Sequence, residues 1–259
     1  MSDHVDVPPE VISVAEERAR AKADRDFATA DALRDRIAAL GYVVTDTSEG
    51  FQLTPKPPYE VAPALAAVAA AGPLAREATC VVGLLVDGWP DDVERCIRAV
   101  VDNTGPEIVV VALDCGNVGG AGDMVHRLAQ GSAGRVIELH VSGTLAQVGW
   151  GKAIAALLEA SGSEFFAAMD LSTVLDGDAL GPILSVFDDP SVVGSGWRGV
   201  DVDLDDNWRS FVDAEPGEVD AVLGYLIVVR RSTALTAGPH PKAVFYRNAD
   251  MEWSLALRE

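Results

Sequence analysis

The sequence predicts an α/β protein with a mainly parallel sheet, preceded by a small helical segment. From residue 80 onward, strand-length apolar runs alternate with stretches of helical periodicity, and several of the runs end directly in an aspartate. Strands that alternate with helices pair in parallel through right-handed crossovers. In residues 10–40 the apolar positions instead recur every three or four residues, which is typical of amphipathic helices.

Composition limits the partners and the compartment. The 259 residues contain 20 Lys and Arg against 40 Asp and Glu, a formal net charge of -20. This charge repels nucleic acid and anionic lipid, so we expect the chain to bind neither. Cys80, Cys96 and Cys115 are far apart and form no CxxC motif, which argues against a zinc site or a disulfide framework. The acidic start does not resemble a signal peptide, and no run is long enough to span a membrane, so we expect a cytoplasmic protein.

The N-terminal segment should form two helices and a hairpin. One apolar stripe predicts the second helix, with a glycine at its end, and two short apolar runs flank a polar turn at 46–50. The stripe is Phe27, Ala30, Leu33, Ile37 and Leu40, and the flanking runs are 42–44 and 51–53.

The charged pattern at 17–20 and 26–35, followed by Gly41 and Asp46-Thr47-x-x-Gly50, resembles the small C-terminal helical element of cysteinyl-tRNA synthetases. The resemblance implies a helical module rather than aminoacylation, because the signatures of a synthetase catalytic domain are missing. Residues 1–56 hold seven Lys and Arg against eleven Asp and Glu. An RNA-associated role is an alternative that this charge opposes. We expect a packing module, or one that binds a protein partner or a second copy of the chain.

Pro55-Lys56-Pro57-Pro58 predicts a stiff linker. We therefore expect a helical appendage at 1–56, a linker and docking segment with an Ala-rich helix at 57–79, and a main domain at 80–259.

In the main domain the alternation is regular up to residue 196. Pro90 suits the first position of a helix, with Asp91 and Asp92 in the first turn. The acidic string 201–206 lacks the spacing of a calcium loop, so we expect a mobile, solvated loop. The expected strands are 81–86, 107–113, 136–141, 165–169, 191–196 and 221–229, and later helices are expected near 154–158, over 178–187 and before Arg258.

Acids follow successive strands. Asp87, Asp114 and Asp170 stand at strand ends, and Asp250 lies near the C-terminus. Each alone could be a turn or cap residue. Because the carboxyl ends of parallel strands share one edge, the acids together predict a site for a metal-bridged diphosphate and a base that activates an acceptor. The glycine-rich stretches at 116–122 and 149–153 match neither a dinucleotide fingerprint nor a P-loop, so a nicotinamide or flavin enzyme is not expected.

An ordered set of pieces resembles family 2 glycosyltransferases of the GT-A fold, namely 81–88, 109–116, 147–153, 169–172, 220–231 and 248–255. The resemblance implies transfer of a sugar from a nucleotide-diphospho-sugar to an acceptor, with inversion and assisted by Mg²⁺ or Mn²⁺. Asp170 and Ser172 would hold the metal, and Asp250 would be the catalytic base. The residues implied to bind the nucleotide-sugar are Val86, Asp87, Asp114, Gly149, Lys152 and Asp170.

Two departures from the family pattern leave an alternative open. Ser172 replaces the second carboxylate of the DxD motif, and Ala249 replaces the Glu that usually precedes the last Asp. The chain could therefore be a catalytically degenerate binding or scaffold protein that keeps the fold. Asp250 itself could simply cap the last helix, where Asn would serve as well.

Overall fold

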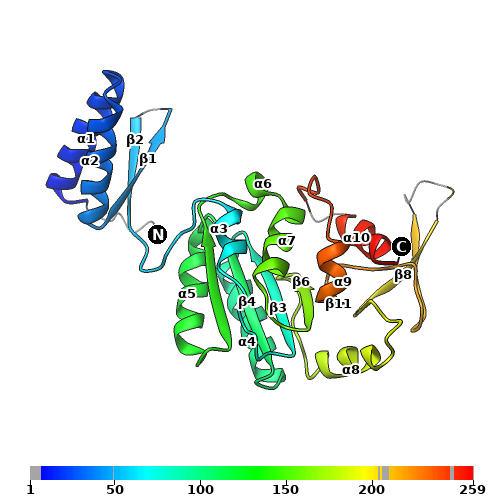
Figure 1. Cartoon of the computed structure of the whole chain (residues 1–259). Helices are drawn as coiled ribbons and strands as arrows, with labels where there is room; N and C mark the ends of the chain where they lie inside the picture. Colours follow the sequence, from blue (N-terminus) through cyan, green and yellow to red (C-terminus); the bar gives the residue numbers. More distant parts are fainter. Residues whose placement is uncertain (1–6, 49, 204, 206–209, 246–247, 259) are drawn as a thin grey trace. The chain divides into compact units, whose positions relative to one another are not determined.

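The computed structural model describes residues 7–48, 50–203, 205, 210–245 and 248–258. Its contacts divide the chain into two compact units, 1–58 and 59–259. Figure 1 shows the elements of both units, each of which is described by itself.

The first unit packs two helices on a hairpin, as expected. Helices α1 (Pro9–Ala23) and α2 (Phe27–Ala39) precede strands β1 (Tyr42–Thr47) and β2 (Gly50–Pro55), which pair antiparallel. The expected apolar stripe is wrong at Phe27, whose side chain is 62% exposed because it begins the helix rather than facing the core. Asp26 caps α2 by accepting a hydrogen bond from the Thr29 amide. The core of this unit consists of Val11, Val14, Ala15, Ile37 and Val44.

In the part of the chain that is described, the second unit is built on a six-stranded sheet. Five of its strands run in one direction, and one, Leu226–Arg230, runs antiparallel to both of its neighbours. The order across the sheet is β5 (Val136–Val141), β4 (Ile108–Cys115), β3 (Cys80–Val86), β6 (Phe165–Met169), β11 (Leu226–Arg230) and β7 (Gly194–Gly196).

Helices cover both faces of this sheet, because the central strands are apolar on both sides (Figure 1). On one face lie α4 (Pro90–Asn103), α5 (Ala121–Gly131) and α8 (Leu180–Ser185), the last continued by the 3₁₀ turn η2 (Val186–Asp188). On the other lie α3 (Leu65–Ala70), α7 (Trp150–Ala160), α9 (Arg231–Thr236) and α10 (Ala249–Arg258). Two short turns, η1 (Val118–Gly120) and α6 (Leu145–Val148), precede α5 and α7. The expected fold class is confirmed.

The region after residue 196 differs from expectation. The strand expected at 221–229 is wrong, because the chain turns at 223–225 and splits it into β10 (Ala221–Val222) and β11. β10 joins a separate sheet with β8 (Gly199–Val202) and β9 (Phe211–Asp213). The loop expected at 201–206 is wrong at Asp201 and Val202, which belong to β8; residues 204 and 206 lie outside the described residues.

Residues 59–79 pack along the sheet of the second unit. The Ala62 amide donates to the His140 carbonyl, and the Ser142 amide donates to the Ala62 carbonyl, so this segment pairs with β5. Further on, Leu74 forms the same kind of paired contact with residues 160–162 at the end of α7. Among the described residues, no helix is long and apolar enough to cross a membrane.

Candidate functional site

Three of the four acids lie at one edge of the sheet, as the sequence predicts. Asp114 pairs in register with Val86, the residue before Asp87, and Leu84 pairs with Met169, the residue before Asp170. Partial loss of surrounding water, and then repulsion from the Asp170 carboxylate, raise the pKa of Asp87. This edge of the sheet therefore concentrates negative charge.

The Asp170 carboxylate begins a tight turn. The Ser172 amide donates to its Oδ1 at 2.8 Å, and the Ser172 hydroxyl donates to the same oxygen. The Asp170 amide and the Thr173 hydroxyl both donate to the carbonyl of Tyr225, which holds the turn against the 223–225 connection. Within the described residues, no hydrogen bond reaches Asp170 Oδ2. One carboxylate oxygen therefore stays available to a ligand.

A divalent metal fits this turn only with help from a ligand. The described residues contain no group of three His, Cys, Asp or Glu side chains placed to hold a metal. The carboxylate of Asp170 and the hydroxyl of Ser172 are nevertheless hard oxygen donors, of the kind that Mg²⁺ and Mn²⁺ prefer. Such an ion would take its remaining ligands from a diphosphate and from water.

Asp250 is buried and forms two backbone contacts. Its Oδ2 accepts a hydrogen bond from the Gly224 amide at 2.7 Å, and its Oδ1 accepts one from the Met251 amide at 2.9 Å. The residue is only 4% exposed. Burial raises its pKa, while the two amides act in the opposite sense. Asp250 lies inside α10 rather than before it, and the Glu252 amide bonds to the Asn248 carbonyl. The carboxylate therefore does more than cap the helix.

Asp170 and Asp250 are connected through consecutive residues of one segment. Gly224 donates its amide to Asp250, and Tyr225 accepts the amide of Asp170. The turn that breaks the expected long strand is thus the element that joins the candidate metal ligand to the candidate base.

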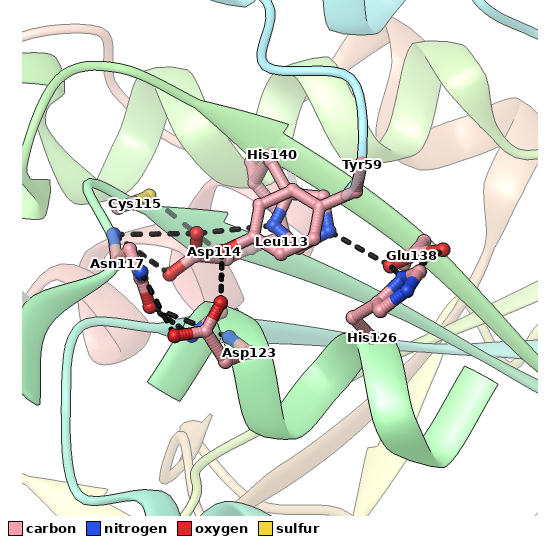
Figure 2. A network of polar contacts seen from close by, with 10 residues as sticks. Tyr59, Leu113, Asp114, Cys115, Asn117, Asp123, His126, Glu138 and His140 are labelled. Carbon is pink, nitrogen blue, oxygen red and sulfur yellow. Dashed lines mark hydrogen bonds and ion pairs between the residues drawn. The ribbon is translucent and has the colours of Figure 1, made fainter. Parts of the chain in front are cut away.

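Asp114 belongs to a polar network on the α5 side of the sheet (Figure 2). The residue is 1% exposed, and its carboxylate accepts a hydrogen bond from the Asn117 amide at 3.1 Å and contacts His140 Nδ1 at 3.1 Å. α5 can approach this closely because residue 122 is glycine; a Cβ atom there would lie 2.4 Å from Asp114 Oδ2.

Several residues of this network were not expected from the sequence, among them Tyr59, Glu138, His140 and His126. Glu138 contacts both His140 Nε2 at 3.0 Å and His126 Nδ1 at 2.9 Å. The Tyr59 ring stacks on His140 with centroids 3.8 Å apart. A signal was present for two of them: in the run 138–141 polar and apolar residues alternate, so Glu138 and His140 share a strand face.

The remaining expected residues are Val86, Gly149 and Lys152. Val86 is fully buried at the end of β3. Gly149 has φ +88° between α6 and α7, and the next two amides, of Trp150 and Gly151, donate to carbonyls of the 243–244 segment. Lys152 is exposed in the first turn of α7 and, within the described residues, forms no ion pair with the acids.

The N-terminal unit is similar in sequence to known proteins. Residues 4–52 match the cysteinyl-tRNA ligase anticodon binding domain. The cysteine–tRNA ligase of Opitutus terrae is 52% identical over 50 residues, which is 19% of this chain and 11% of that enzyme. That of Methanosarcina mazei is 49% identical over 45 residues, 17% of this chain and 10% of the enzyme. The chain thus spans only about a tenth of the length of these relatives.

The solved structures similar to the chain include glycosyltransferases. A mannosyltransferase from Pyrobaculum calidifontis, solved with GDP-Man and Mn²⁺, has a TM-score of 0.53 and 15% identity over 76% of this chain and 54% of its own. GalNAc-T7, solved with UDP, GalNAc and Mn²⁺, has a TM-score of 0.56 and 12% identity over 70% of this chain and 40% of its own. Residues 1–349 of S. aureus TarS, solved with UDP, have a TM-score of 0.52 and 12% identity over 68% of this chain and 54% of their own.

These likenesses define the class of each unit. The second unit has the GT-A fold, with the mainly parallel sheet that the sequence predicts. The first unit is similar in sequence to the anticodon binding domain of cysteinyl-tRNA ligases. At identities of 12–15% the structural likeness shows the fold alone.

Proposed function

We propose that the second unit is a glycosyltransferase that moves a sugar from a nucleotide-diphospho-sugar to an acceptor, with inversion. The observation that carries the proposal is the link between Asp170 and Asp250 through Gly224 and Tyr225. It connects the backbone of Asp170, whose carboxylate suits a metal-bridged diphosphate, to the carboxylate of Asp250, which suits proton removal.

Each acid has a distinct role in this proposal. Asp170 and Ser172 would hold a divalent ion, whose charge would offset that of the leaving diphosphate. Asp114 holds the nucleoside, and Val86 and Asp87 flank the base; Gly149 and Lys152 complete the donor site. Asp250 takes the proton from the acceptor hydroxyl while the acceptor oxygen bonds to the anomeric carbon and the bond to the diphosphate breaks. Its raised pKa strengthens it as a base.

One observation favours a second candidate, a binding or scaffold protein. The Ser172 hydroxyl stands where a second carboxylate would serve the metal, and in this structure it donates to Asp170. A site weakened in this way could retain nucleotide without transferring sugar.

A thermal-shift panel of UDP-, GDP- and dTDP-sugars with and without Mn²⁺ tests the proposal. A donor at a hundred times its Kd adds about 2.7 kcal/mol of stability, which raises Tm by roughly 5–10 °C for a unit of this size. The shift should shrink in Asp170→Asn and persist in Glu159→Gln, a matched charge removal on the exposed surface of α7. Release of nucleoside diphosphate from the same donor separates the two candidates: binding with release supports the transferase, binding without release the scaffold, and no binding refutes both.

A further inference from the structure

His140 contacts a carboxylate through each of its ring nitrogens. Nδ1 lies 3.1 Å from Asp114 Oδ2 and Nε2 lies 3.0 Å from Glu138 Oε2, and the side chain is 2% exposed. A neutral imidazole has one N–H and one acceptor nitrogen, so it can donate to only one of two carboxylates. Both contacts are satisfied when the ring is an imidazolium, which donates twice.

The surroundings of His140 are closed and mainly acidic (Figure 2). Asp114 and Glu138 contact the ring from β4 and β5, and Tyr59 covers it with rings inclined at 18°. From α5, Asp123 accepts the Tyr59 hydroxyl at 2.9 Å, and His126 contacts Glu138. Burial lowers the pKa of His140, but the hydrogen bonds to Asp114 and Glu138 outweigh it and the net shift is upward.

This arrangement determines where the Asp114 carboxylate points. The Asn117 amide contacts both of its oxygens, at 3.1 and 3.3 Å, and His140 holds Oδ2. A buried carboxylate without such donors would be costly and free to rotate. His140 supplies both the compensating charge and a fixed direction.

We propose that His140 is a positioning residue of the nucleoside site: its imidazolium holds Asp114 in the orientation that accepts a hydrogen bond from the nucleoside, so nucleotide affinity falls when rising pH deprotonates the ring. The inference rests on the nucleoside role of Asp114 in the proposed function. The sign follows from the geometry. Below the pKa of His140 both carboxylates have a donor; above it, Asp114 and Glu138 compete for a single N–H, so Asp114 loses its donor in part of the molecules.

Two variants that remove the same ring separate positioning from packing. The side-chain amide of His140→Asn places its nitrogen near the position of Nδ1 and keeps the donor to Asp114. The amide of His140→Gln reaches instead toward the position of Nε2 and keeps the donor to Glu138. Both lose the stacking partner of Tyr59, so a merely structural role predicts equal effects.

The measurement is the Kd of UDP and of GDP with Mn²⁺, between pH 6 and 9, by calorimetry. We expect wild-type affinity to decline through the pKa of His140. His140→Asn should bind within about threefold of wild type at low pH and lose the pH dependence, whereas His140→Gln should bind roughly tenfold or more weakly, as expected for one hydrogen bond to a charged group. His240→Asn is the control, because His240 is exposed and its ring nitrogen only accepts the Lys242 amide; it should keep the wild-type profile.

Imidazole ¹⁵N NMR of the ligand-free chain gives a second readout. Both His140 nitrogens should carry protons at pH 7, and a neutral ring there would overturn the inference. Two results would overturn this inference alone. One is that His140→Asn and His140→Gln weaken nucleotide binding equally, and the other is that the wild-type affinity for nucleotide does not change with pH. Failure of the wild type to bind any nucleotide would overturn the proposed function and, with it, the nucleoside role of His140.

Discussion

Replacing Asp250 with asparagine separates its catalytic role from its structural role. The sequence alone suggests that Asn could cap the helix equally well. The structure changes this expectation, since the two carboxylate oxygens accept from two different amides, those of Gly224 and Met251. Asn has one acceptor oxygen, so its NH₂ group would face the other N–H. Leaving that buried donor unsatisfied should cost about 1–3 kcal/mol.

The expected loss of activity is larger than unfolding can produce. Removing a general base slows a reaction about a hundredfold or more. If the unit is stable by about 5 kcal/mol, the low end for a domain, then losing 3 kcal/mol leaves about 2 kcal/mol, and more than roughly 95% of the molecules stay folded. A hundredfold decrease in rate would therefore report on chemistry.

The assay is release of nucleoside diphosphate at saturating donor, well below Tm. Ser254→Ala is the matched control: one turn further along α10, the Ser254 hydroxyl accepts from the Val222 amide at 3.1 Å and donates to the Val222 carbonyl at 3.0 Å. It should lower Tm comparably and keep the rate. Because burial raises the pKa of Asp250, the wild-type rate should fall on acidification at a pH above the ordinary range of Asp. An Asp250→Asn enzyme with more than a tenth of wild-type turnover would refute the assignment, as would an equal loss in Ser254→Ala.

Three further predictions concern the metal, the N-terminal unit and its response to acid. The free protein should bind Mn²⁺ weakly, since Asp170 is the single carboxylate of its motif, and more tightly with nucleoside diphosphate present; equal affinities by titration calorimetry would show that Asp170 is no diphosphate bridge. Deleting residues 1–56 should leave nucleotide affinity intact, and the full chain should form no salt-sensitive complex with tRNA in filter binding; abolished nucleotide binding or a salt-sensitive complex would contradict this. The Arg18 and Lys22 side chains lower the pKa of Asp46, so their ion pairs should stabilise β1 above about pH 4 and lose that effect as pH falls further; the protection of the β1 amides against hydrogen exchange, relative to the intrinsic exchange rate at each pH, should decrease in acid, and Asp46→Asn should remove most of this dependence.

Much of the main domain follows from local patterns. Continuous apolar runs predict β3, β4 and β6, since a strand buried on both faces has no polar side. The placement of Asp87, Asp114 and Asp170 at one edge follows from the direction of parallel strands and is confirmed by the register. The roles of these residues stay predictions.

Other features depend on contacts that no local pattern contains. The start of α5 is rich in glycine, which disfavours helix in isolation, and the closeness of Asp114 to Gly122 becomes apparent only once the helix is packed. The strand is interrupted at 223–225, where the backbone instead forms hydrogen bonds with Asp170 and Asp250. Tyr59 reaches His140 across 81 positions of chain, a distance over which periodicity carries no information.

The pairing of Ala62 with β5 has a consequence for how the chain behaves outside its native state. Among the described strands, β5 ends the six-stranded sheet on that side. An uncovered edge strand offers unpaired amides and carbonyls to other chains and so promotes aggregation. On that edge, the backbone of Ala62 forms hydrogen bonds with the His140 carbonyl and the Ser142 amide. A fragment that begins at residue 80 would lose this cover, so we expect it to self-associate through β5, whereas one that begins at residue 59 should remain dispersed.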